Sequence, residues 1–165
     1  MGLLSRNGSP AMSTHSALVC WQRGDAAFVD NRYSRLHEWE FDGGVRVRAA
    51  ASPDVVPLPL TAADAVDPEE AFVAALASCH MLWFLSLAAE RGVRVDRYED
   101  AAIGHMRRNA EGRLAITEVV LRPRLAFDDA HAPSAAAIAD LHAAAHSRCF
   151  LAASVTAQIR IEPRP

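Results

Sequence analysis

The sequence lacks the features that mark nucleic-acid-binding, membrane or secreted proteins. Its 165 residues carry a formal net charge of −3 with acids and bases interspersed, and there is neither a basic block nor an acidic tail. No apolar run reaches the roughly 18 residues of a membrane span, since Ser78 and His80 interrupt the longest run, Ala71 to Ala89. The N-terminus also lacks the charged and then apolar order of a secretory signal. These absences predict a soluble, cytoplasmic protein without nucleic-acid or membrane partners.

Cysteine is also scarce. The three cysteines Cys20, Cys79 and Cys149 are odd in number and far apart in sequence, which excludes a disulfide scaffold. Each thiol must therefore be judged by its own surroundings, and a small buried hydrophobic side chain is the plain interpretation of any one of them. Nothing around Cys20 indicates reactivity, so we interpret it as structural.

The remaining composition is that of an ordinary globular protein, with 51% hydrophobic and 22% charged residues. The length suits one domain with a sizeable core, and no internal repeat or domain boundary is evident. Residues 1–15 are polar and contain Gly, Ser and Pro, so we predict a disordered N-terminal segment. Residues 16–165 are predicted to form a single domain.

The first half of the domain is predicted to contain strands. A short strand is expected at Ala17 to Gln22. The turn signal Asp42-Gly43-Gly44 lies between two alternating segments and predicts a β-hairpin. Three prolines in the segment Ser52 to Leu60 predict a loop or an extended stretch.

A long helix is predicted next. Asp67 suits the N-cap position, Pro68 the first helical position, and two acids, Glu69 and Glu70, the first turn. The helix is expected to end near Gly92. Because it is apolar on most sides, it must be largely buried. One small sheet covers only one face of such a helix, so either the fold wraps around it or a second chain covers it. We favour an oligomer in which long helices from two chains share a core.

The last third of the chain is predicted to contain two strands, a helix and a final strand. The two strands flank the turn Asn109 to Gly112, and the second helix begins at Pro133-Ser134 and ends near Cys149. The segment Ser154 to Pro163 is expected to close the chain as a strand. The order is three strands, helix, two strands, helix and strand, which predicts an α+β fold.

Two of the thiols occupy positions where reactivity has a physical rationale. Cys79 lies within the first helix and Cys149 at the end of the second. Burial alone raises a thiol's pKa above about 8.5 and makes it inert, so a reactive thiol needs a nearby cation. The candidates are Arg32, Arg35 and the neighbouring histidines, and an arginine in this role would need a carboxylate to hold it in place. Glu69 lies about 15 Å along the helix axis from Cys79, so it reaches only the far side of such an arginine.

Two segments resemble a known family. "VDPEEAFVAALASCHMLWFL" and "AHSRCFLAASV" are similar to the first- and second-cysteine segments of the OsmC/Ohr family of thiol-dependent hydroperoxide reductases. In the first, a Pro-Glu pair opens a long helix with cysteine ten residues after the glutamate, and in the second Ala-His precedes cysteine by two intervening residues. The resemblance runs from Tyr33 to the C-terminus and is greatest to a branch with the pattern YSRxHxWxFDGG.

The resemblance implies an OsmC-like fold, with antiparallel sheets wrapped around two long central helices in an intertwined homodimer. It implies that Cys79 attacks the peroxide O–O bond and becomes a sulfenic acid, and that Cys149 then condenses with it to a disulfide. A dithiol or a lipoylated protein would reset the pair, and no cofactor is expected. Arg35 is the better match for the activating arginine, with Arg32 as the alternative, and Glu69 matches its partner by spacing.

The same residues allow other interpretations. Met81, Phe84 and Phe150 are more often core residues than substrate contacts, although some must line the access route to an active Cys79 and would favour an organic hydroperoxide. His80 is more often a core histidine than a catalytic base. A second hypothesis is a zinc site, although no CxxC or HExxH pattern supports it; its ligands would be Cys79, His80, His142, His146 and Cys149. A third is a catalytically silent dimer that binds a small apolar ligand between helices.

Overall fold

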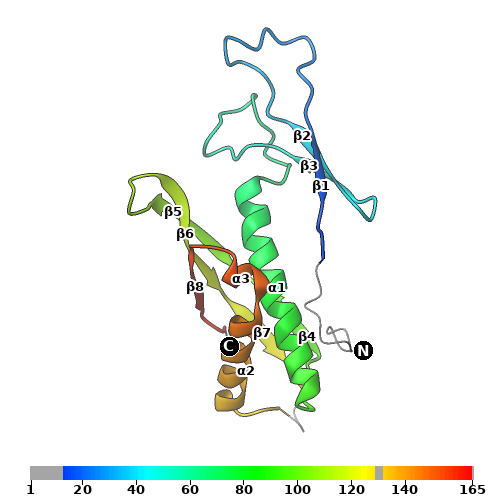
Figure 1. Ribbon diagram of the computed structural model, residues 1–165, viewed down its shortest axis with the longest axis vertical. Helices are drawn as coiled ribbons and strands as arrows, with labels where there is room; N and C mark the ends of the chain where they lie inside the picture. Colours follow the sequence, from blue (N-terminus) through cyan, green and yellow to red (C-terminus); the bar gives the residue numbers. More distant parts are fainter. Residues whose placement is uncertain (1–12, 129–131, 165) are drawn as a thin grey trace. The chain divides into compact units, whose positions relative to one another are not determined.

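The computed structural model describes residues 13–128 and 132–164. The chain divides into two compact units, Met1–Asp67 and Pro68–Pro165, and each is described here by itself. The first unit contains β1 (Ala17–Cys20), β2 (His37–Phe41) and β3 (Arg46–Ala49). The second contains α1 (Pro68–Glu90), β4 (Arg97–Asp100), β5 (Ile103–Arg108), β6 (Leu114–Leu121), β7 (Pro123–Ala126), α2 (Ala135–Arg148), α3 (Phe150–Ala153) and β8 (Gln158–Ile161) (Figure 1). The predicted α+β class is confirmed.

The first unit is built on an antiparallel sheet in the order β1-β2-β3. The predicted hairpin is confirmed: the Phe41 N–H donates to the Val45 carbonyl at 3.0 Å. Gly44 has φ +78, a conformation that favours glycine over other residues. β1 is an outer strand whose four side chains are all exposed, and it ends at Cys20, short of the predicted Gln22. Of the predicted disordered segment, residues 1–15, the part from residue 1 to residue 12 lies outside the described residues.

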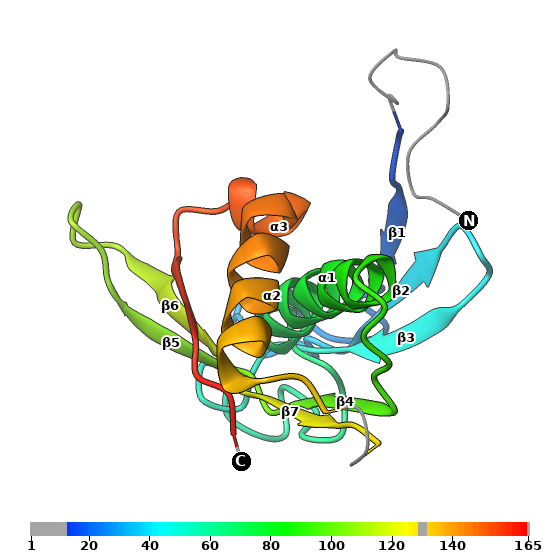
Figure 2. The ribbon, with the colours of Figure 1, turned by 90° about the horizontal axis from the view of Figure 1, so that it is seen from below.

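Helix α1 is the central element of the second unit (Figure 2). It begins at Pro68 and is followed by Gly92 at φ +70, both as predicted. Its first half packs against the sheet that contains β6. There Leu76 forms one cluster with two buried β6 residues, Val119 and Leu121. The second half packs against α2. There the cluster consists of Phe84, Leu87 and Ala88 of α1 with Leu141 and Ala145 of α2.

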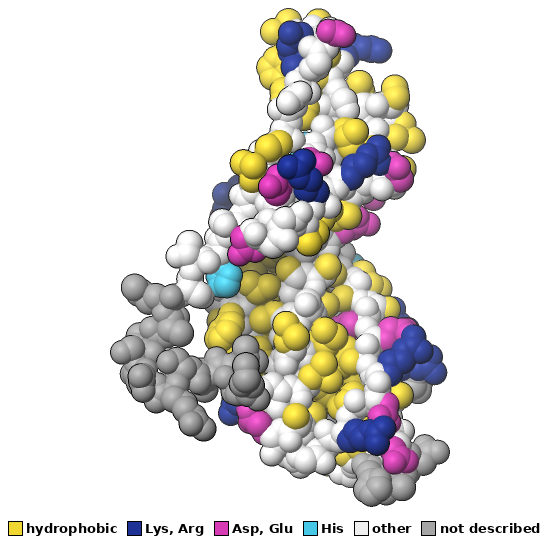
Figure 3. Space-filling view, turned by 90° about the vertical axis from the view of Figure 1, so that its right-hand side faces the viewer, with side chains coloured by type: hydrophobic (Ala, Val, Ile, Leu, Met, Phe, Trp, Pro, Cys, Tyr) yellow, Lys and Arg dark blue, Asp and Glu magenta, His cyan; other side chains and the backbone are white. Residues whose placement is uncertain are grey.

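The burial predicted for α1 is only partly realised in the single chain. Five of its residues are buried, whereas Leu82 is 57% exposed. Figure 3 shows hydrophobic side chains gathered on one face of the second unit. By length and composition alone α1 is apolar enough to cross a membrane, but its buried face contributes to both core clusters of this unit. The exposed side is therefore an apolar surface on a core helix.

The sheets of the second unit differ from the prediction in two respects. β5, β6 and β8 form one sheet, but β8 runs parallel to β6, so the expectation of antiparallel sheets is wrong for this pair. The connection through α2 and α3 is long enough for a parallel crossover, and side-chain alternation does not reveal strand direction. β4 and β7 form a separate two-stranded sheet that was not predicted. The four-residue helix α3 was not predicted either.

Candidate functional site

The fold brings two of the three cysteines into contact. Cys79 lies in the middle of α1, and Cys149 joins the end of α2 to the start of α3. Their side chains are hydrogen-bonded to each other, although 70 residues separate them in sequence. The Cys149 sulfur also caps α3 by accepting from the Ala152 N–H at 3.4 Å. Both thiols are free, and Cys20 is an exposed free thiol on β1 of the first unit.

The two paired thiols have different surroundings. Cys149 is only 2% exposed, whereas Cys79 is half-buried. Burial, and secondarily the hydrogen bond with Cys79, raises the pKa of the Cys149 thiol to about 11. Cys149 therefore keeps its proton at neutral pH. Of the pair, Cys79 is the thiol that solvent and small molecules reach.

His80 of α1, which follows Cys79 in sequence, and His142 of α2 form a buried pair. Nε2 of His80 and Nδ1 of His142 are 3.0 Å apart and the rings are stacked. Burial, and secondarily the charge of His142, lowers the pKa of His80 to about 4, and burial lowers the pKa of His142 to about 4. Both rings are thus neutral near pH 7. This geometry favours the core interpretation of His80, while His146 is exposed.

A zinc site receives no support from the geometry. Within residues 13–128 and 132–164, no three His, Cys, Asp or Glu side chains are placed to hold a metal ion together.

The candidate arginines lie in the first unit. Arg35 donates from Nη1 to the Asn31 carbonyl at 3.0 Å and from Nη2 to Asn31 Oδ1 at 2.7 Å. Nη1 also donates to the Tyr33 carbonyl, and the guanidinium carbon lies 3.8 Å from the centre of the Tyr33 ring. The backbone N–H of Arg32 donates to Asp30 Oδ1 at 3.0 Å. Glu69 belongs to the first turn of α1 in the second unit, so its pairing with Arg35 stays a prediction.

The three predicted substrate contacts lie in different environments. Phe84 is fully buried in the cluster between α1 and α2, where it packs against His142. Phe150 is 67% exposed and meets the Trp83 ring edge to face, with centroids 5.4 Å apart. Met81 is half-buried on α1. Phe150 and Met81 are thus at least partly exposed, and the substrate role of all three stays a prediction.

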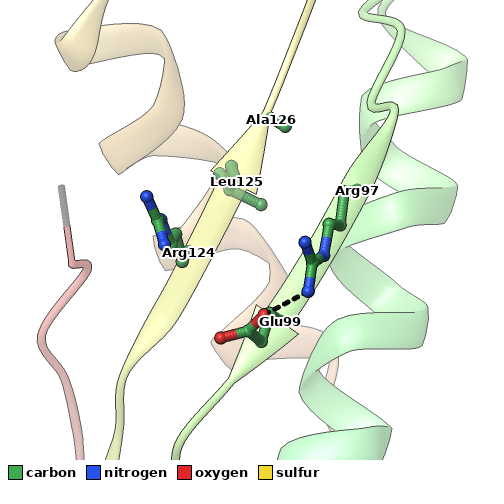
Figure 4. A pocket seen from close by; sticks show the side chains of 5 residues that line it. All are labelled: Arg97, Glu99, Arg124, Leu125 and Ala126. Carbon is green, nitrogen blue, oxygen red and sulfur yellow. Dashed lines mark hydrogen bonds and ion pairs between the residues drawn. The ribbon is translucent and has the colours of Figure 1, made fainter.

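Two shallow cavities are present in the second unit. One of about 220 Å³ lies over the β4–β7 sheet, where Arg97 donates to Glu99 (Figure 4). The other, of about 290 Å³, is apolar apart from Glu69. Neither of these two cavities is lined by Cys79 or Cys149. The residues of the second are Pro68, Glu69, Phe72, Met106, Leu114, Ala115 and Ile116.

Several side chains around Arg35 were not among the predicted site residues. Besides Asn31 and Tyr33, His37 accepts from Trp39 and contacts the Arg35 carbonyl. The sequence did indicate the contact between His37 and Trp39, because residues two apart on a strand share a face. The contact with Asn31 depends on a turn that the sequence does not reveal.

Comparison with known proteins identifies the family of the chain. The model of the OsmC-like protein family matches residues 61–164. The chain is also 50% identical to an OsmC-like protein of unknown function from Vibrio cholerae, over 93% of this chain and 100% of that one, with a TM-score of 0.90. The chain belongs to the OsmC-like family. Its predicted OsmC-like fold is confirmed.

More distant members share the fold. An organic hydroperoxide resistance protein from Elizabethkingia anophelis is 15% identical, with a TM-score of 0.69 and coverage of 94% of this chain and 96% of that one. Another from Bacillus subtilis is 19% identical, with a TM-score of 0.63 and coverage of 93% and 100%. A search of curated proteins found no match.

Proposed function

We propose that this OsmC-like protein is a thiol-dependent peroxidase that reduces organic hydroperoxides through Cys79 and Cys149. The observation that carries the proposal is the contact between the two thiols, which lie on separate helices and differ in burial. Membership of the OsmC-like family and the fold shared with organic hydroperoxide resistance proteins agree with it.

The reaction proceeds in three balanced steps. The Cys79 thiolate attacks the O–O bond, the sulfur gains one oxygen, and the alkoxide leaves and takes up a proton to become an alcohol. The Cys149 thiol then attacks the sulfenic acid, which forms a disulfide and releases water. A dithiol reduces the disulfide by exchange and is itself oxidised to a cyclic disulfide. No metal or organic cofactor takes part.

The difference between the two thiols assigns their roles. Cys149 keeps its proton because burial raises its pKa, so it is a poor first nucleophile. It stands in contact with Cys79, where a sulfenic acid would form, and it needs little movement to resolve that acid. Its position between α2 and α3, at a helix end, gives its backbone room to adjust to the disulfide geometry.

Arg35 is proposed to favour the thiolate form of Cys79, with Glu69 fixing the arginine. A guanidinium is permanently charged and stabilises an adjacent anion, and a carboxylate on its far side orients it. Arg35 is preferred to Arg32 because its guanidinium is held by four contacts, whereas the contact that fixes Arg32 is made by its backbone N–H. Met81, Phe84 and Phe150 are proposed to favour an apolar hydroperoxide.

The active form is proposed to be a cytoplasmic homodimer of single 16–165 domains. The exposed side of α1 supports this, because an apolar face of a core helix is stabilised when a second copy covers it. The reductant is proposed to be a small dithiol or a lipoylated protein.

The proposal is tested by mass spectrometry of peroxide-treated protein digested without reductant. We expect one linked peptide pair, Cys79 with Cys149, formed in proportion to the peroxide consumed. Turnover with dihydrolipoamide should be faster for cumene hydroperoxide than for hydrogen peroxide. A linkage through Cys20, or peroxide consumption without any linked peptide, would overturn the two-cysteine assignment. A protein that consumes no peroxide would instead support a silent ligand-binding dimer.

A further inference from the structure

Several contacts fix the side chain and backbone of Arg35 in the first unit. Its backbone N–H donates to the Leu60 carbonyl at 2.8 Å. Its guanidinium group donates to two oxygens of Asn31 and to the Tyr33 carbonyl. The Tyr33 ring faces the guanidinium carbon at 3.8 Å, within the range of a cation–π contact. Arg35 is half-buried, and these contacts together fix the direction of its side chain.

Asn31 has an unusual backbone that makes its double contact possible. Its φ of +60 lies in the left-handed region, which asparagine tolerates better than most residues. In this conformation both the carbonyl and the side-chain oxygen of Asn31 meet the guanidinium group, at 3.0 and 2.7 Å. Hydrogen bonds from a charged donor are stronger than neutral ones, so this pair holds the arginine firmly.

Aromatic packing supports the same turn. The Phe28 and Tyr33 rings lie 4.7 Å apart, and the Trp21 ring meets Tyr33 edge to face at 5.2 Å. Trp21 also donates from Nε1 to the Ser34 carbonyl at 2.7 Å. Tyr33 is therefore fixed on one side by aromatic rings while it faces Arg35.

The backbone carbonyl of Arg35 is fixed as well. Because a carbonyl only accepts, the contact of 2.8 Å requires that Nδ1 of His37 carries the proton. Nε2 of the neutral ring is then an acceptor, and it receives the Trp39 Nε1–H at 3.0 Å. Trp39 thus sets the tautomer of His37, and His37 holds the carbonyl of Arg35.

Counting hydrogen bonds shows which N–H donors of the Arg35 guanidinium group are still unused. A guanidinium group has five N–H donors, and the three bonds to Asn31 and Tyr33 occupy both of Nη1 and one of Nη2. Within residues 13–128 and 132–164, the Nε–H and the second N–H of Nη2 make no hydrogen bond, so both can serve a partner. An ion pair formed by a pre-oriented guanidinium loses less side-chain entropy than one formed by a free arginine.

We infer that Asn31 and Tyr33 are positioning residues that orient Arg35 for its work on Cys79. This inference rests on the proposed function, in which Arg35 favours the thiolate form of Cys79. The pair acts through Arg35 and touches no reacting atom. His37 and Trp39 support it by holding the backbone from which the Arg35 side chain extends.

Matched variants separate the contacts. Asn31→Gly keeps the left-handed backbone and the carbonyl but removes the Oδ1 contact, and Asn31→Asp restores an acceptor. Tyr33→Leu removes the ring, and Tyr33→Phe restores it. Arg35→Ala removes the whole guanidinium group and therefore gives the largest change against which the other variants are compared. Asp30→Ala is the control, because it removes a bond within the same loop, to the Arg32 N–H, without touching Arg35.

The measurement is the rate of alkylation of Cys79 by iodoacetamide between pH 5 and 9, followed by mass spectrometry of the Cys79 peptide. It requires no peroxidase turnover. We expect Arg35→Ala to slow alkylation at pH 7 most and to move the pH midpoint upward. Asn31→Gly and Tyr33→Leu should each slow it by about 3- to 10-fold, the size expected when a contact of a charged group is lost in part. Asn31→Asp and Tyr33→Phe should recover most of the rate, and Asp30→Ala should match the parent protein.

The outcomes distinguish this inference from the proposed function. If Arg35→Ala slows alkylation while Asn31→Gly and Tyr33→Leu do not, Arg35 keeps its role and the positioning inference is overturned. If Arg35→Ala itself has no effect, the arginine of the proposed function is wrongly assigned and nothing remains to be positioned. If Asp30→Ala slows the reaction as much as Asn31→Gly, general order of the loop explains the effect and the inference also fails. Thermal melting of each variant identifies any loss of fold, and the Tyr33 pair supplies a second test should Asn31→Gly unfold.

Discussion

The two units of the chain are stabilised in different ways. The second unit encloses two clusters of buried apolar side chains, one on each half of α1. Among the residues that the structure describes, the first unit contributes to neither cluster, and its buried apolar residues are the small Ala49 and Ala50. Leu18 and Val19 on its outer strand β1 are more than half exposed. A three-stranded sheet without a covered apolar face is marginal by itself.

The two units also differ in the reactive side chains that they carry. The second unit carries the two thiols in contact, whereas the first carries the fixed Arg35 and the isolated thiol of Cys20. A well-packed unit is suited to hold reacting atoms at fixed distances. A unit with little core of its own is suited to a role that depends on assembly. The following predictions test whether this division holds.

The largest expected effect is on turnover. Cys79→Ser should abolish peroxide reduction, because a serine hydroxyl is a far weaker nucleophile than a thiolate. Cys149→Ser should allow one attack and then leave a sulfenic acid that excess peroxide over-oxidises. Cys20→Ser, the control from the first unit, should keep the parent rate. Stopped-flow peroxide consumption and intact-mass measurement of added oxygen check these outcomes. If Cys79→Ser retained turnover, the assignment of the reacting thiols to the second unit would be wrong.

Core substitutions should distinguish the stability of the two units. Leu121→Ala in the second unit removes a buried side chain and should lower the free energy of unfolding by about 2–5 kcal/mol. Leu18→Ala in the first unit removes a side chain that is 56% exposed in the single chain and should cost much less at low protein concentration. Urea unfolding at several protein concentrations makes the comparison. Equal losses at every concentration would show that the first unit has a core of its own.

Acid should weaken the second unit through its histidine pair. The pKa values of His80 and His142 are about 4 in the folded protein, below the unfolded value of 6.5. Between pH 6.5 and 4 the unfolded chain therefore binds protons that the folded chain does not, so the free energy of unfolding falls as pH drops through this window. The loss should be up to about 3 kcal/mol for each histidine.

Urea unfolding at pH 7, 6, 5 and 4.5 measures this loss. The double variant His80→Leu, His142→Leu should lose less stability over this range than the parent protein. His146→Gln is the matched control, because His146 is an exposed histidine of α2. A double variant with the same pH dependence as the parent would show that the buried pair does not govern acid sensitivity.

The smallest expected effect is on assembly. Leu82→Glu places a charge on the exposed side of α1, and it should shift a homodimer toward monomer because desolvating the carboxylate opposes association. Leu114→Glu, at a position on β6 that is 66% exposed, is the control and should leave the oligomer intact. Light scattering at micromolar concentration reports the mass. A parent protein that is already monomeric would contradict the predicted homodimer. Assembly would then not explain why the first unit has so little core of its own.

The sequence by itself determined the helices and turns whose signals are local. Pro68, Gly44 and Gly92 mark their elements through backbone conformation, and each was predicted correctly. Ser134 behaves likewise: it caps α2 by accepting from the Ala137 N–H at 3.2 Å. Cys79 and Cys149 were identified as candidates from their positions on helices and from the resemblance of the surrounding segments to a family.

Only the tertiary structure decided the contacts between distant segments. The parallel direction of β8, the hydrogen bond between Cys79 and Cys149, and the stacking of His80 on His142 join residues at least 40 positions apart. No local periodicity encodes such pairings, because they depend on how the helices and sheets pack. The hold of Asn31 on Arg35 is local in sequence, but it depends on a left-handed turn that asparagine permits and does not compel.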